Sequence, residues 1–125
     1  MTDERARRAE EGLRFVCEFE VSDIERFKAL VAQCVEVSRG EPGTLVYDWY
    51  LDERRGVAHL YEAYSSVEAL SAHASGPVFK DIGPKLLEVC RFVKIDAYGD
   101  LPRGPSFAPT TRWGTAFARL AGSSD

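Results

Sequence analysis

The sequence predicts a single α+β domain, and two kinds of pattern support this. In some stretches apolar and polar residues alternate, as in a strand with one buried face, and in others apolar residues recur at helical spacing. Along the chain these stretches follow the order strand, helix, strand, strand, helix, strand. With 125 residues, of which 45% are hydrophobic and 29% charged, the chain can bury an ordinary core as one domain.

The first strand is predicted over LRFVCEFEV (13–21), where every second residue from Leu13 onwards is apolar. Ser22 and Glu25 then form a capping-box pattern, in which the serine accepts from a free amide and the glutamate reaches back. A helix is therefore expected to start at this point. Gly40 is a natural end for it, because glycine is common just past a helix.

A hairpin follows. Glu41-Pro42-Gly43 has the composition of a turn, and TLVYDWYL (44–51) reads as the second strand. The polar segment 52–56 predicts a second turn, so that VAHLYEAY (57–64) returns antiparallel as the third strand. Neither face of the third strand is clearly polar, which predicts that both of its faces are covered.

A second capping-box pattern, formed by Ser65 and Glu68, predicts the second helix. The apolar stripe of this helix consists of Val67, Leu70 and Ala74. His73 lies at the edge of that stripe. A further turn or short helix is expected after Pro77, followed by the fourth strand, VCRFVKIDAY (89–98).

This order of elements is the ferredoxin-like, or split βαβ, pattern, with a four-stranded antiparallel sheet and both helices on one face. The domain is expected over residues 13–98, with a charged N-terminal arm (1–12) and an irregular C-terminal extension (99–125) that has a short helical possibility at Thr115–Ala121. Two helices cover only one side of such a sheet. Since a bare apolar sheet face is rare on a monomer, a homodimer that pairs these faces is predicted.

Composition excludes several classes of function. The net charge of -4 argues against a nucleic-acid binder, and no apolar run approaches the length of about 20 residues that crosses a membrane. The charged N-terminus has no signal-peptide core, so a cytoplasmic protein is expected. Three distant cysteines, Cys17, Cys34 and Cys90, predict buried reduced thiols and no metal site. There is also no glycine-rich phosphate loop and no nucleophile elbow.

Two segments resemble the antibiotic biosynthesis monooxygenase family. EPGTLVYDWYLD is similar to the family's "EPG…Y…Y.D" opening, and HLYEAYSSVEALSAHASGPVFK is similar to its "YE.W…EAL..H…P.F" segment. The resemblance covers roughly residues 13–98 and implies a dimeric α+β barrel. It further implies relatives that oxidise quinols or polycyclic phenols with molecular oxygen and without metal or flavin, and others that degrade haem. Where the haem degraders carry a histidine ligand this sequence has Gly83-Pro84, which argues against haem, and Tyr64 replaces the family's tryptophan.

Oxidation without a cofactor requires a phenol or hydroquinone to lose a proton, and histidine suits this task because its ordinary pKa is about 6.5. His73 is the leading proton partner, and the resemblance also places a histidine there; the alternative is a histidine that bonds to the end of its helix. His59 is the second candidate, with packing or an interface contact as the alternative. His59 and Glu62 point to opposite faces of a strand, so a direct pair is not expected.

Five aromatic residues are candidates for a wall that binds a flat ligand, with core and interface packing as the alternative. They are Tyr47, Trp49, Tyr61, Tyr64 and Phe79.

Together these features favour a monooxygenase-like enzyme, without cofactor, that acts on a small aromatic or quinone-like molecule and molecular oxygen. A non-catalytic dimeric module that binds a small hydrophobic ligand remains open, as does an isomerase or decarboxylase on the same fold. Analogy between folds cannot choose among these three.

Overall fold

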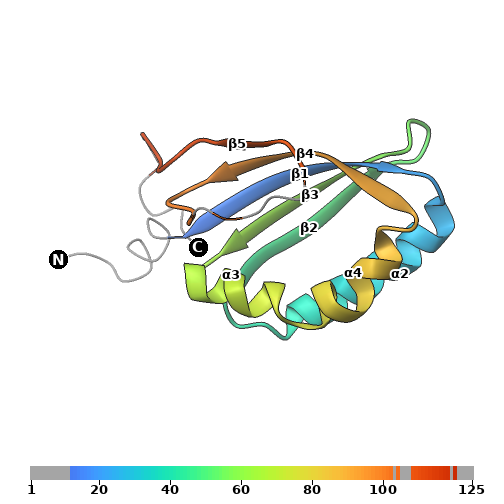
Figure 1. Cartoon of the computed structure of the whole chain (residues 1–125), viewed down its shortest axis with the longest axis horizontal. Coiled ribbons are helices and arrows are strands. Elements are labelled where there is room, and N and C mark those ends of the chain that lie inside the picture. Colours follow the sequence, from blue (N-terminus) through green and yellow to red (C-terminus); the bar gives the residue numbers. More distant parts are fainter. Residues whose placement is uncertain (1–11, 103, 105–107, 119, 121–125) are drawn as a thin grey trace.

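A computed structural model describes residues 12–102, 104, 108–118 and 120. The chain forms one twisted sheet, and Figure 1 shows the helices gathered along one side of it. The elements in order are β1 (Leu13–Val21), α2 (Ile24–Arg39), β2 (Thr44–Asp52), β3 (Val57–Tyr64), α3 (Val67–Ala74), the π-helix η1 (Val78–Ile82), α4 (Gly83–Leu86), β4 (Cys90–Tyr98) and β5 (Thr110–Arg112).

The sheet has the order β2-β3-β1-β4-β5. Its first four strands pair antiparallel, which confirms the predicted ferredoxin-like topology. The prediction of four strands was wrong, because β5 in the C-terminal extension pairs parallel with β4, with Thr110 opposite Ile95 and Arg112 opposite Ala97. A strand of three residues in a segment rich in glycine and proline carries no alternation that a sequence pattern could reveal.

The ends of the chain are described only in part. The predicted N-terminal arm lies outside the described residues except for Gly12. The helical possibility at Thr115–Ala121 is not found over residues 115–118, which are irregular, and most of its remainder lies outside the described residues.

Both long helices start one residue later than their capping-box patterns predicted. Asp23, not Ser22, caps α2 by accepting a hydrogen bond from the Arg26 amide. Ser22 still belongs to the strand end, because its amide and its hydroxyl both donate to the Val89 carbonyl, at 2.8 and 3.0 Å. Long-range pairing of the backbone thus decides which neighbouring polar residue becomes the cap.

The start of α3 repeats this shift. Ser66 caps the helix by accepting from the Ala69 amide at 3.1 Å. The amide of Ser65, the predicted cap, instead donates to the Gly43 carbonyl at 3.0 Å. This bond ties the first turn of α3 to the turn that precedes β2.

The turn at Glu41-Pro42-Gly43 is confirmed, and it lies unusually close to α3. A Cβ atom built on Gly43 would lie 2.4 Å from the Cβ of Ala69. Glycine is therefore required here by the close approach of two elements. Its small size brings Glu41 next to the helix that carries His73.

The core lies between the helices and the facing side of the sheet. It contains Cys17, Phe19, Phe27, Leu30, Cys34, Ala58, Leu60, Val78, Ile82, Leu86, Val89 and Cys90. Helix α3 departs from its predicted stripe: Val67 is 37% exposed, whereas His73 is only 1% exposed. The helix turns His73 toward the sheet, whereas Val67, at the start of the predicted stripe, faces outward.

The opposite face of the sheet carries no helix in the described part of the chain (Figure 1). Tyr50 and Tyr61 are 60% and 43% exposed there, and their rings pack edge to face at 5.5 Å. Nε2 of His59 lies 3.1 Å from Oε1 of Glu18, across β3 and β1. No described helix is long and apolar enough to span a bilayer.

All three cysteines are buried and free, as predicted. Burial raises the pKa of the Cys34 and Cys90 thiols to about 11. Since the thiolate is the reactive form, we expect a soluble thiol reagent to label the folded protein slowly near neutral pH and to label all three cysteines after unfolding. Rapid labelling of the native chain, followed by mass spectrometry, would contradict this placement.

Candidate active site

A cavity of about 470 Å³ lies between α3, η1 and the helix-side face of the sheet. This volume falls in the usual range for small-molecule sites. Its lining is mostly apolar and aromatic, with a few polar groups. The lining residues are Phe15, Cys17, Glu62, Tyr64, Leu70, His73, Ala74, Phe79, Phe92, Ile95, Leu101, Pro102, Gly104, Thr110 and Arg112.

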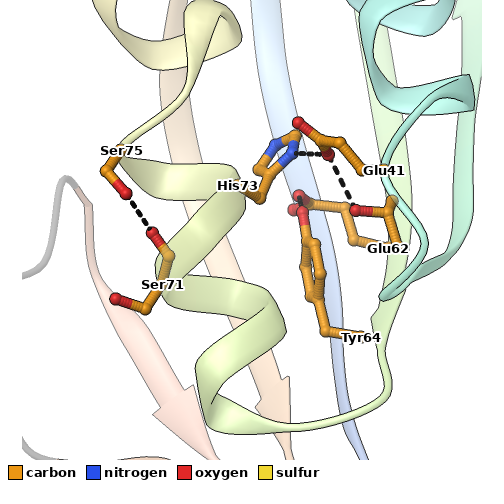
Figure 2. A network of polar contacts seen from close by, with 7 residues as sticks. Glu41, Glu62, Tyr64, Ser71, His73 and Ser75 are labelled. Carbon is orange, nitrogen blue, oxygen red and sulfur yellow. Dashed lines mark hydrogen bonds and ion pairs between the residues drawn. The ribbon is translucent and has the colours of Figure 1, made fainter.

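His73 is fixed by a carboxylate from the turn before β2. Its Nδ1 lies 2.6 Å from Oε1 of Glu41, as Figure 2 shows, and the same oxygen accepts a hydrogen bond from the Thr44 hydroxyl at 2.8 Å. A carboxylate at Nδ1 favours the neutral tautomer that carries its proton on that nitrogen. Nε2 is then left with a lone pair that can accept a proton.

Three aromatic rings surround the imidazole. The ring centroids of Tyr64, Tyr47 and Phe79 lie 5.3, 5.4 and 5.6 Å from that of His73. They come from β3, β2 and η1, so three separate elements hold the imidazole in place. This packing leaves His73 only 1% exposed to solvent and limits the movement of its ring.

A second carboxyl group, that of Glu62, lies in the same wall. Tyr64 donates a hydrogen bond to Oε1 of Glu62 at 2.5 Å, and the Cys17 thiol contacts Oε2 at 3.6 Å. Figure 2 shows the side chains of Glu62 and Tyr64 beside His73. Burial raises the pKa of Glu62, and the hydrogen bond from Tyr64 and the nearby His73 oppose this only in part. Burial also raises the pKa of Tyr64, which therefore stays a hydrogen-bond donor.

The C-terminal extension closes one side of the cavity. Arg112, on β5, donates to the carbonyls of Leu101 and Pro102 at 2.7 and 3.0 Å. Trp113 stacks on Tyr98 with ring centroids 6.0 Å apart. These contacts hold the residues after β4 against the cavity wall, so the extension forms part of the site.

We expect Arg112→Ala to weaken this wall, because it removes two charge-assisted hydrogen bonds that are partly screened by solvent. Stability should fall by about 1 kcal/mol, and an aromatic ligand in the cavity should bind several-fold more weakly. Arg91→Ala is the matched control, because Arg91 is an exposed β4 arginine that pairs with Glu20 away from the cavity. Equal ligand affinity in the two variants, measured by titration, would show that the extension does not support the site.

A family model places the chain among known proteins. The model for antibiotic biosynthesis monooxygenases matches residues 21–85, just over half of the chain. The chain belongs to the antibiotic biosynthesis monooxygenase family. Six of the fifteen residues that line the cavity lie inside the matched range, and β1, β4, β5 and the residues between β4 and β5 supply the other nine.

Solved structures share the fold of this monooxygenase family member. A candidate antibiotic biosynthesis monooxygenase from Bacteroides thetaiotaomicron is 26% identical, with a TM-score of 0.61 over 66% of this chain and 82% of that one. A conserved protein from Methanosarcina mazei Go1 is 21% identical, with a TM-score of 0.65 over 74% and 96% of the two chains. MupZ from Pseudomonas fluorescens is 19% identical, with a TM-score of 0.66 over 87% and 95%. None of the curated proteins matches this chain.

In this family member the fold separates the candidate residues that the sequence grouped together. His73, Tyr64 and Phe79 line the cavity, and Tyr47 packs against His73. Trp49 is half-buried and packs against the core, beside Phe19, Phe27 and Tyr47. His59 and Tyr61 lie on the opposite face of the sheet.

On that opposite face, His59 and Tyr61 line a shallow groove of about 380 Å³ together with Val46, Asp48 and Tyr50. As expected, the side chains of His59 and Glu62 lie on opposite faces of the sheet, because successive residues of β3 point to opposite sides. The hydrogen-bond partners of Glu62 are Tyr64 and Cys17.

Sequence reasoning gave neither Glu41 nor Glu62 a role in this cavity. Glu41 reads as part of a turn, and only the close approach at Gly43 brings it to His73. The sequence did contain a signal for Glu62, because it lies between Leu60 and Tyr64 on the inward face of its strand. A carboxylate is rarely buried there without a partner. Within the described chain, no group of three or more His, Cys, Asp or Glu residues is arranged to hold a metal.

Proposed function

We propose that this family member oxidises a small phenolic or hydroquinone-type aromatic with molecular oxygen, without a cofactor, in the cavity that contains His73. Membership of a family of monooxygenases supports this reaction class. The single observation that carries it is the pair formed by His73 and Glu41 in the wall of an aromatic cavity. Such a pair supplies a positioned base where a flat ring can lie.

The proposed reaction starts with proton transfer from the substrate to Nε2 of His73. Glu41, hydrogen-bonded to Nδ1, stabilises the imidazolium that forms. The resulting electron-rich anion transfers an electron to dioxygen. In the balanced monooxygenation, one oxygen atom enters the substrate and the other leaves as water with two hydrogens taken from the substrate.

The apolar walls serve this chemistry in two ways. Tyr64, Phe79 and Phe92 line the cavity with rings against which a flat substrate can stack. Removal of water also strengthens the interaction between the imidazolium and the carboxylate, because the local dielectric constant is low. The chain's own side chains are thus assigned the roles of base, base orienter and binding wall.

We also propose that the protein works as a homodimer through the face of the sheet that carries no helix. Tyr50 and Tyr61 are large, exposed and adjacent on that face. His59 and its partner Glu18 would then be interface contacts. Sedimentation at micromolar concentration is expected to give a dimer, and Tyr61→Asp is expected to weaken it. A wild-type monomer would contradict the proposal.

Oxygen uptake tests the proposed activity. The purified, metal-free protein is expected to consume oxygen with at least one member of a panel of hydroquinones and anthrone-like phenols, above the autoxidation control. If no member is oxidised but some bind saturably, the non-catalytic binding module becomes the better account. If a substrate is converted without oxygen uptake, the isomerase or decarboxylase account replaces the oxygenase.

A further inference from the structure

The carboxyl group of Glu62 lies in the cavity wall, yet the proposed proton transfer to His73 does not use it. Its two oxygens differ in their surroundings. Oε1 accepts a hydrogen bond from the Tyr64 hydroxyl at 2.5 Å, whereas among the described residues Oε2 contacts only the Cys17 thiol, at 3.6 Å. A thiol is a weak donor, so Oε2 is the oxygen left for a ligand.

The surroundings of Glu62 disfavour its charged form. Within the described residues, no lysine or arginine forms an ion pair with it. The other titratable or charged groups near it, from each neighbouring element, are Cys17 on β1, Tyr47 on β2, Tyr64 on β3, Glu41 before β2, His73 on α3 and Arg112 on β5.

Burial raises the pKa of Glu62, so the neutral carboxyl group persists to higher pH than in an exposed glutamate. A neutral carboxyl group carries one proton that it can donate. Because Tyr64 already donates to Oε1, the proton belongs on Oε2, the oxygen without a strong partner.

We propose that Glu62 acts as a neutral carboxyl group whose Oε2–H donates a hydrogen bond to a keto oxygen of the substrate. The cavity would then prefer an aromatic that carries a keto oxygen over a ring of the same shape without one. This rests on the proposed function only in taking this cavity as the substrate site. Tyr64 is the positioning residue, because it fixes Oε1 and thereby directs Oε2.

The chemical value of this contact lies in the anion that proton loss creates. When a ring conjugated to a ketone loses a proton, much of the negative charge collects on the keto oxygen. A donor that is already in place stabilises that charge in a site with little water, and a neutral acid does so without bringing another charge into the cavity. His73 would thus accept the proton of the conjugated system, while Glu62 donates to its keto oxygen.

The test uses two flat probes that do not titrate, fluorenone and fluorene, which share a ring system and differ in the keto oxygen. The quantity measured by equilibrium dialysis is the ratio of the fluorene Kd to the fluorenone Kd. Wild-type protein is expected to give a ratio about tenfold higher than Glu62→Met, which keeps the bulk and has no donor. Glu62→Gln keeps an N–H donor and is expected to preserve most of the ratio.

The pH dependence separates Glu62 from its neighbours. As the pH is raised, the wild-type ratio is expected to fall because Glu62 loses its proton, whereas the Glu62→Gln ratio stays constant because an amide does not titrate. A similar fall in the Glu62→Gln protein would assign the effect to another group and overturn the proposal. Equal ratios in wild type and Glu62→Met would also overturn the proposal for Glu62. If both probes still bound in that case, the cavity would remain the ligand site.

Discussion

Replacement of His73 by glutamine is expected to lower the rate of substrate-dependent oxygen uptake by about 100-fold or more, the usual contribution of a general base. Glutamine has a similar bulk and can still contact Glu41, so the cavity and the fold should survive. It has no basic nitrogen to accept the substrate proton. The loss should therefore appear in kcat, with KM changed little.

His59→Gln is the matched comparison for this experiment. The chain has only two histidines, and the structure places His59 on the face of the sheet away from the cavity, paired with Glu18. Uptake by the His59 variant should stay close to that of the wild type. A His73 variant with full activity would show that the base has been misassigned, and a greater loss in the His59 variant would move the site to the other face.

The second large effect is expected from Gly43→Ala. The added Cβ would lie 2.4 Å from the Cβ of Ala69, so either the turn before β2 or helix α3 must move. Overpacking of this kind typically costs about 1–3 kcal/mol. Because the turn carries Glu41 and the helix carries His73, the same movement should lengthen their 2.6 Å contact and lower the activity.

Gly40→Ala tests whether this effect is specific. A Cβ on Gly40 meets its nearest neighbour, the Val37 carbonyl oxygen, at 3.6 Å, which is ordinary contact. Its φ of -85° also suits alanine, so stability should change little or rise slightly. Urea unfolding of both variants measures the difference. Equal midpoints would mean that the close approach of the turn and α3 does not constrain the protein.

Local patterns predicted most of the fold because its strands and helices have clear periodicity. The alternation over β1 and the apolar spacing of α2 placed these elements correctly, and the turn signals placed the hairpin. The capping patterns were displaced by one residue at both helices, because Ser22 and Ser65 are held by backbone bonds to distant residues. Such bonds depend on the assembled fold, which a window of sequence does not contain.

Only those residues of the candidate site whose type and local position in the sequence already suggest a role could be predicted. His73 was identified as the proton partner, but its carboxylate partner Glu41 is 32 residues away in the chain. The five aromatic candidates do not all line one wall, because strand alternation places Tyr61 on the face opposite Tyr64. The contribution of β5 and Arg112 could not be predicted, since the extension has no periodicity and its place depends on pairing with β4.

The most direct measurement of the central claim is the fate of labelled dioxygen. The protein would be incubated under ¹⁸O₂ with whichever phenol of the panel supports uptake, beside an autoxidation control and the His73→Gln variant, and the product analysed by mass spectrometry. Oxygenation in this cavity is expected to give one labelled oxygen atom per product molecule, at a rate that falls with loss of His73. A product without label, or label incorporated equally by the control and the variant, would contradict oxygenation in this cavity.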